Sequence, residues 1–132
     1  MMTKKRNIYR SSRITHRVSP FSSKVTIIIA SDIQMTGKRE DFLKNITVSE
    51  SMLAFTATST TGRVYIVLPE NVKPATIVHE SYHAIRHVLK YHQVENDEEV
   101  FAYHLDDLFE VISAFVKKYR RKKRKFCPIR QV

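Results

Sequence analysis

One short segment, ATIVHESYHAIRH at residues 75–87, carries side chains whose types and spacing could bind and use a metal ion. His79 and His83 are four residues apart, so on a helix both imidazoles lie on one face and can bind a single ion. Glu80 lies one position round from His79, where it can take a proton from a water molecule held by that ion. His87 continues the stripe about 6 Å further along the helix, where it is expected to support the ligands or to lie in solvent, not to bind the ion itself.

A catalytic zinc ion needs a third protein ligand and an open fourth position. The polar stretch QVENDE at residues 93–98 predicts a turn, after which a second helix must fold back on the first. Glu98 and Glu99 lie at the start of that helix, and both can supply the third ligand. The alternative is that the two histidines are interior residues bonded to the backbone, which leaves the glutamate between them buried without a reason.

The segments HESYH and EEVFAY together resemble the gluzincin pattern of zinc metallopeptidases. In scale, the chain is similar to small metallopeptidase-like proteins of phages and mobile elements. The resemblance covers residues 63–112 and leaves both ends of the chain outside it. It implies a bound Zn²⁺ ion, with Glu98 as the alternative to Glu99. The residues that it assigns are the metal ligands His79, His83 and Glu99 and the general base Glu80.

Two features depart from the family pattern. Tyr103 stands where relatives often carry Asp or Asn, and only 15 residues separate His83 from Glu99. Tyr103 and His104 lie near the expected third ligand and are candidates to stabilise a transition-state oxyanion, with ordinary packing or surface exposure as the alternative for both. A peptide substrate is expected to pair with the free edge of the strand at residues 63–68 as an added strand.

The elements that must position these residues follow from hydrophobic periodicity and turn signals. The predicted strands are residues 24–30, 52–58 and 63–68, with a hairpin turn over residues 59–62 between the last two. The predicted helices are residues 39–45, 75–92 and about 97–119. The fold class is therefore α+β. By the resemblance it is a minimal zincin-like domain, in which a small, mostly antiparallel sheet precedes the H-E-x-x-H helix and a second, Glu-bearing helix.

Composition bounds the class of protein. A chain of 132 residues with 42% hydrophobic residues predicts one compact domain. No apolar run approaches the ~20 residues needed to span a bilayer, and the basic start lacks the apolar region of a secretory signal. The single cysteine, Cys127, excludes an internal disulfide and a cysteine-based zinc knuckle. These features favour a cytoplasmic protein without a membrane span.

The net charge of +10 is unevenly distributed. Residues 1–24 carry seven Lys or Arg and no acid, and residues 117–132 carry nine and no acid. We therefore expect an acidic core between two basic arms, which either keep the protein soluble or contact nucleic acid or another polyanion through phosphates. The candidates in the C-terminal arm are Lys117, Lys118, Arg120, Arg121, Lys122, Lys123, Arg124 and Lys125.

Three functions from different classes are consistent with these patterns. The first is a zinc metallopeptidase acting on a peptide or protein substrate. The second is a nucleic-acid-associated protein that keeps the zinc fold, loosely resembling SprT-like proteases, with weak or lost activity. The third is a small basic structural protein of a nucleoprotein particle, in which the histidines are incidental. Stoichiometric zinc separates the first two from the third, and salt-dependent nucleic-acid binding supports the second.

Overall fold

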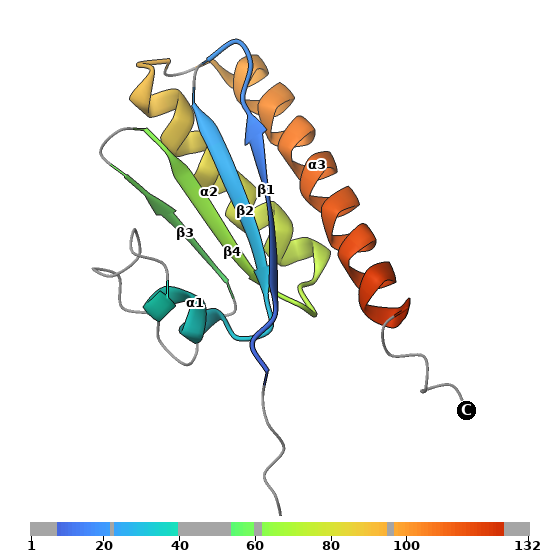
Figure 1. Ribbon diagram of the computed structural model, residues 1–132. Coiled ribbons are helices and arrows are strands. Elements are labelled where there is room, and N and C mark those ends of the chain that lie inside the picture. Colours follow the sequence, from blue (N-terminus) through green and yellow to red (C-terminus); the bar gives the residue numbers. More distant parts are fainter. Residues whose placement is uncertain (1–7, 22, 40–53, 60–61, 95–96, 126–132) are drawn as a thin grey trace, which may run out of the picture.

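The computed structural model describes residues 8–21, 23–39, 54–59, 62–94 and 97–125, with the side chains of 124 and 125 excepted. Within these ranges the chain forms four strands and three helices (Figure 1). In chain order they are β1 (Ser11–Arg17), β2 (Lys24–Ala30), α1 (Ile33–Arg39), β3 (Phe55–Thr58), β4 (Val64–Pro69), α2 (Pro74–Tyr91) and α3 (Glu98–Lys125). No helix in these ranges is long and apolar enough to cross a membrane.

The four strands form one mixed sheet in the order β1-β2-β4-β3. β1 pairs with β2 and β3 pairs with β4 in antiparallel fashion, whereas β2 and β4 are parallel. The predicted α+β class is confirmed, and the sheet is antiparallel at two of its three described pairings. The parallel pairing arises because β3, which begins at the end of the sheet where β2 ends and is antiparallel to β4, returns the chain before β4 begins.

Alternation along the strands divides the sheet into two faces. Val25, Ile27 and Ile29 of β2 point toward α2 and α3, which cover that face, and form the main core with Ile66 and Ile85. Ile28 and Ala30 point the other way, into a smaller cluster on the opposite face, called here the outer face. Figure 1 shows α2 and α3 together behind the sheet and α1 at one end of it.

The predicted hairpin between the second and third predicted strands is present. The Gly62 amide donates to the Ser59 carbonyl at 3.2 Å, and the Ser59 amide donates to the Arg63 carbonyl at 2.9 Å. Gly62 has a φ of +88°, and a Cβ there would lie 2.7 Å from the Tyr91 ring of α2. Glycine is therefore required both by the backbone angle and by the close approach of the helix.

Several elements of the structure differ from those predicted from the sequence. The structure has a helix at Ile33–Arg39, while most of the helix predicted over residues 39–45 lies outside the described residues. Residues 11–17 belong to β1, so this part of the predicted basic N-terminal arm folds into the sheet. The last helix continues to Lys125, well past residue 119, so the predicted C-terminal arm begins as a helix.

The substrate strand expected at residues 63–68 was wrongly placed at an edge. This segment corresponds to β4, which pairs with β2 on one side and β3 on the other, so it has no free edge. The sequence could not reveal this, because a β-branched run is equally compatible with central and edge positions. The outer strand on that side of the described sheet is β3.

A cluster around Glu70 fixes the C-terminal part of α3 to the end of β4. Arg10 donates two hydrogen bonds to the Glu70 carboxylate, at 2.9 and 3.1 Å, and Lys123 donates one at 2.8 Å. The Tyr119 hydroxyl donates another, and Arg120 donates to the Glu70 carbonyl at 3.1 Å. Residues at both ends of the chain therefore converge on one carboxylate.

Candidate metal centre

The position of the candidate ligands is set by how α2 begins and ends. Pro74 occupies the first helical turn, where a missing N–H costs nothing, and Lys73 before it is extended. At the other end Gln93 has a φ of 60°, and the Val94 amide donates to the Leu89 carbonyl at 2.8 Å. This pattern is typical of a Schellman C-terminal cap. Between these limits the buried stripe of α2 faces the sheet and α3.

The helix presents His79 and His83 together on its exposed side. Their Nε2 atoms lie 3.2 Å apart, and their rings meet edge to face with centroids 4.7 Å apart. Two nitrogen ligands of one tetrahedral zinc ion, each at ~2.0–2.1 Å, lie about 3.3 Å from each other. The donor pair therefore has the separation that a shared zinc ion requires.

Glu80 points in a different direction from its neighbour His79. Its side chain is buried, with 6% of its surface exposed, and faces β3. The Thr56 hydroxyl of β3 donates to Glu80 Oε1 at 2.6 Å and lies 3.4 Å from the Glu80 carbonyl oxygen. Among the described residues, no Lys or Arg forms an ion pair with this carboxyl group. Among the described side chains, its hydrogen-bond partner is therefore the neutral Thr56 hydroxyl at the edge of the sheet.

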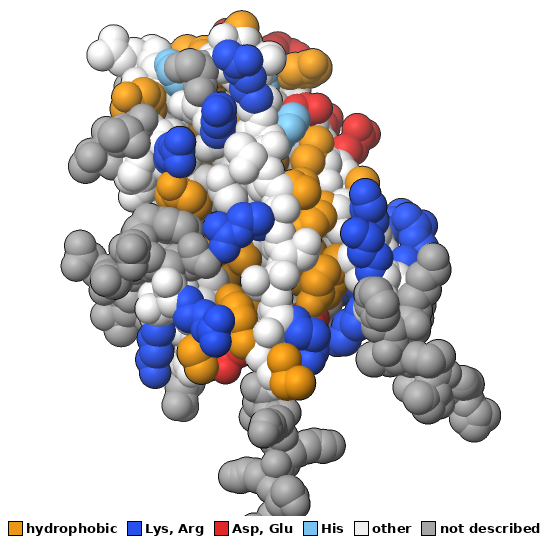
Figure 2. Space-filling view, viewed as in Figure 1, with side chains coloured by type: hydrophobic (Ala, Val, Ile, Leu, Met, Phe, Trp, Pro, Cys, Tyr) orange, Lys and Arg blue, Asp and Glu red, His pale blue; other side chains and the backbone are white. Residues whose placement is uncertain are grey.

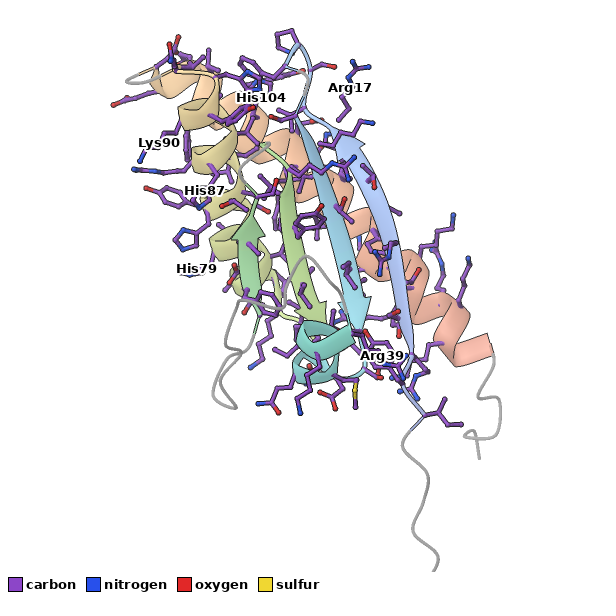
Figure 3. The ribbon with its side chains drawn as sticks, turned by 60° about the vertical axis from the view of Figure 1, so that its left-hand side comes forward. Arg17, Arg39, His79, His87, Lys90 and His104 are labelled. Carbon is purple, nitrogen blue, oxygen red and sulfur yellow. The ribbon has the colours of Figure 1, made fainter. Side chains whose placement is uncertain are left out.

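His87 lies one turn beyond His83, and both side chains are exposed on α2. Figure 3 shows His79 and His87 projecting from the same side of this helix. Burial lowers the pKa of His87, and the nearby positive charges of His83, Lys90 and Arg86 lower it further. A lowered pKa favours the neutral imidazole, which is the form that can bind a metal or accept a hydrogen bond.

The predicted third ligand is not assembled with the histidine pair. Within the residues that the structure describes, no group of three or more His, Cys, Asp or Glu side chains could hold a metal ion. Glu99 is exposed in the first turn of α3. Glu98 lines a surface cavity of about 690 Å³ between α2 and the start of α3, together with Arg86 and Lys90. Neither glutamate is established as a ligand, so both stay predictions.

The two candidates for oxyanion stabilisation lie on α3. Tyr103 is 67% exposed, whereas His104 is 5% exposed and packs near Phe21, with ring centroids 5.6 Å apart. Figure 3 places His104 at the end of the molecule where α3 begins, apart from His79. Tyr103 is therefore a surface side chain and His104 a packed one.

Tyr82 and Thr56 adjoin the candidate site and were not singled out from the sequence. The Tyr82 ring lies 5.9 Å from the His83 ring, its hydroxyl accepts a hydrogen bond from Arg86 at 3.3 Å, and it lines the same cavity as Glu98. A tyrosine inside the H-E-x-x-H segment is a local signal for Tyr82. Thr56 had no such signal, because it is 24 residues from its partner in the sequence.

The structure separates the basic residues of the C-terminal segment into two groups. Arg120 and Lys123 contribute to the Glu70 cluster, with Arg120 also donating to the Val72 carbonyl at 2.7 Å. The exposed group, called here the α3 cations, consists of Lys117, Lys118, Arg121 and Lys122. Arg124 and Lys125 belong to the same helix, but their side chains lie outside the described ones.

Comparison with known proteins assigns no family to this arrangement. No family model, no curated protein and no solved structure matches the chain.

Proposed function

We propose that the protein is a zinc-dependent metallopeptidase-like hydrolase, centred on His79, Glu80 and His83. The observation that carries this proposal is the 3.2 Å separation of the two Nε2 atoms beside a buried glutamate that lacks a described cationic partner. Two exposed histidines alone would be unremarkable on a helix surface. A carboxyl group kept at the sheet edge next to them has a cost that catalysis would explain.

The third ligand is proposed to come from the first turn of α3. Glu99 fits the family pattern in the sequence, while Glu98 is supported by its place in the cavity that also includes Tyr82, the ring neighbour of His83. The donor set of two imidazoles and one carboxylate is one that catalytic zinc sites use. Zinc bound there would act as a Lewis acid on a substrate carbonyl and lower the pKa of water at the site.

Glu80 is assigned the role of general base. The Thr56 hydroxyl donates to Oε1, so Oε2 is the atom left to accept a proton from the attacking water and to return it to the leaving amine. An extended peptide would lie along β3, the outer described strand on the side of Glu80, and pair with it as an added strand. This replaces the strand at residues 63–68 that the sequence suggested.

Metal content tests the proposal directly. We expect about one zinc ion per chain in the purified protein, measured by mass spectrometry after dialysis, because three ligands suffice for a stable site. His83→Ala should lose the zinc. His87→Ala is the matched control on the same face of α2 and should keep it. A wild-type protein that holds no zinc even after reconstitution would overturn the proposal.

Glu98→Gln and Glu99→Gln, measured separately, identify the third ligand. The variant that removes the true ligand should lose zinc, while the other retains it. Zinc retained in both single variants and in the double variant would exclude a ligand from α3. Glu80→Gln should keep the metal, because this residue holds no metal in the proposal, and should abolish cleavage of any peptide that the wild type cleaves.

A second candidate function, association with nucleic acid through the C-terminal segment, is supported by the α3 cations. Lys117 and Arg121, and Lys118 and Lys122, are like-charged pairs four residues apart on the exposed side of α3. Such pairs weaken a helix, each by about 0.2–0.5 kcal/mol, unless an anion neutralises them. Replacing Lys117, Lys118 and Lys122 by Gln should weaken binding to duplex DNA if this segment is the contact, and unchanged binding would exclude it.

A further inference from the structure

A row of positive charges crosses the outer face of the sheet at one end. Arg17 is the register partner of Lys24 in the antiparallel pair β1–β2. In the parallel pair β2–β4, Val25 is the register partner of Val64. The residues one position earlier, Lys24 and Arg63, are therefore also neighbours. Val25 and Val64 are buried under the helices, and their neighbours therefore project from the outer face. All three cations are exposed.

Among the described residues, this face carries cations without matching carboxylates. The sequences of β1, β2, β3 and β4 contain no Asp or Glu. Among the residues that the structure describes, Arg17, Lys24 and Arg63 form no ion pair with an acid. Figure 2 shows the outer face, with Lys and Arg side chains crossing its upper part and the visible acidic side chains mostly at one rim.

The row costs the fold free energy, which calls for an explanation. Like charges directly opposite on neighbouring strands are destabilising, by up to about 1 kcal/mol for a pair. Lysines on edge strands often prevent aggregation. Lys24, however, begins β2 and Arg63 directly precedes β4, and these are the two central strands of the sheet, with no edge to protect. Neutralisation by a bound anion would remove the repulsion.

We propose that the Arg17–Lys24–Arg63 row binds the phosphate backbone of nucleic acid. Strands are ~4.8 Å apart, so the row spans roughly 10 Å. Each nucleic-acid strand carries one charge per ~3.4 Å of helix axis, so the row faces about three phosphates. The hydroxyls of Thr15 and Thr26, 3.3 Å apart, lie on the same face next to the row and can donate to phosphate oxygens.

An anionic membrane is the less suitable partner for this surface. Proteins that lie on a membrane bury apolar side chains beside their cations. The exposed large hydrophobic residues of the described chain lie on the helices or before β1, and none lies on a strand. The inference does not depend on the zinc site, and it concerns the opposite side of the sheet from the one that α2 and α3 cover.

The test is fluorescence anisotropy of the full chain with labelled duplex DNA of roughly 20 base pairs and with the single strand, at about 50 to 200 mM salt. The variant Arg17→Gln/Lys24→Gln/Arg63→Gln should bind at least about tenfold more weakly than wild type. Its slope of log affinity against log salt should be smaller by about 2 to 3, because three phosphate contacts are lost. Its thermal midpoint should not fall, since the substitutions relieve repulsion.

The matched control is Lys38→Gln/Lys73→Gln/Lys90→Gln, which removes the same charge from exposed positions elsewhere. It should bind within about threefold of wild type. Equal weakening in both triple variants would overturn the proposal, because only net charge would then matter. Absence of nucleic-acid binding by wild type at low salt would also overturn it. So would binding to phosphatidylserine vesicles alone, or a loss confined to the α3-cation variant.

Discussion

At the scale of single residues, Glu80 has the least ordinary environment in the described structure. It is 6% exposed, and its side-chain partner among the described residues is the Thr56 hydroxyl. A carboxyl group is well solvated in water, so its burial beside a single neutral donor costs free energy. His79 and His83, by contrast, are exposed and cost little. Of these three residues, Glu80 is therefore the one whose placement fold stability does not explain.

We expect Thr56→Val to destabilise the fold by about 1–3 kcal/mol, because the buried carboxyl group loses its donor while the side-chain volume is nearly unchanged. Urea denaturation measures the change. The matched control is Thr15→Val on the exposed outer face. The Thr15 hydroxyl bonds to Thr26 and is exposed, so this substitution should change stability by less than about 0.5 kcal/mol. Equal effects of the two substitutions would contradict a specific Thr56–Glu80 interaction.

At the scale of elements, the long helix α3 depends on the Glu70 cluster at its C-terminal end. Burial opposes ionisation of Glu70, but hydrogen bonds from Arg10, Lys123 and Tyr119 outweigh it and lower the pKa of Glu70 from 4.5 to about 2. Burial and the hydrogen bond to Glu70 together raise the pKa of Tyr119 to about 12, so the phenol stays a donor. The cluster is therefore strongest with the carboxylate ionised.

The lowered pKa of Glu70 predicts how stability depends on pH. Because the carboxylate is favoured in the folded state, its contribution is complete above about pH 4.5 and is lost as the pH falls toward about 2. Allowing for solvent screening, we expect a loss on the order of 1–2 kcal/mol. Urea midpoints between about pH 6 and pH 2.5 should fall more steeply for wild type than for Glu70→Gln. Parallel curves would exclude Glu70 as the titrating group.

At the scale of the whole molecule, the positive charges of the described residues occupy separate surfaces. Arg120 and Lys123 hold α3 to the end of β4, and the α3 cations next to them are exposed. The row Arg17–Lys24–Arg63 lies on the outer face of the sheet, away from both groups. The sequence alone assigns these residues, except Arg63, to two basic arms. Of the described cations in those arms, Arg120 and Lys123 are held in the Glu70 cluster, whereas the α3 cations, Arg17 and Lys24 are exposed.

Ending the chain at Lys118 should therefore destabilise the protein and not merely reduce its charge. The truncation removes Tyr119, Arg120 and Lys123 and leaves Arg10 as the described partner of Glu70. We expect a loss on the order of 2–4 kcal/mol, since a partly buried carboxylate loses most of its donors. Thermal unfolding of Lys117→Gln/Lys118→Gln/Lys122→Gln should stay close to wild type. A truncated chain as stable as the full chain would show that the cluster contributes little.

Local patterns in the sequence predicted much of the secondary structure. The helix Pro74–Tyr91 follows from its apolar spacing and from Pro74, and the β3–β4 hairpin follows from two β-prone segments with Gly62 between them. The run of β-branched residues likewise predicted β2. These features depend on residues close together in the chain, where propensity and periodicity act directly. The pairing of His79 with His83 belongs to this group, because four residues on a helix make one turn.

Contacts between distant parts of the chain were decided only by the tertiary structure. Thr56 and Glu80 are 24 residues apart, and Glu70 lies 60 residues from Arg10 and 53 from Lys123. The strand order places β4 in the centre of the sheet. It also brings Arg17 and Lys24 next to Arg63, which is far from them in the sequence. Such contacts require the entropic cost of closing long loops to be met by the packing of the whole core, which no local pattern encodes.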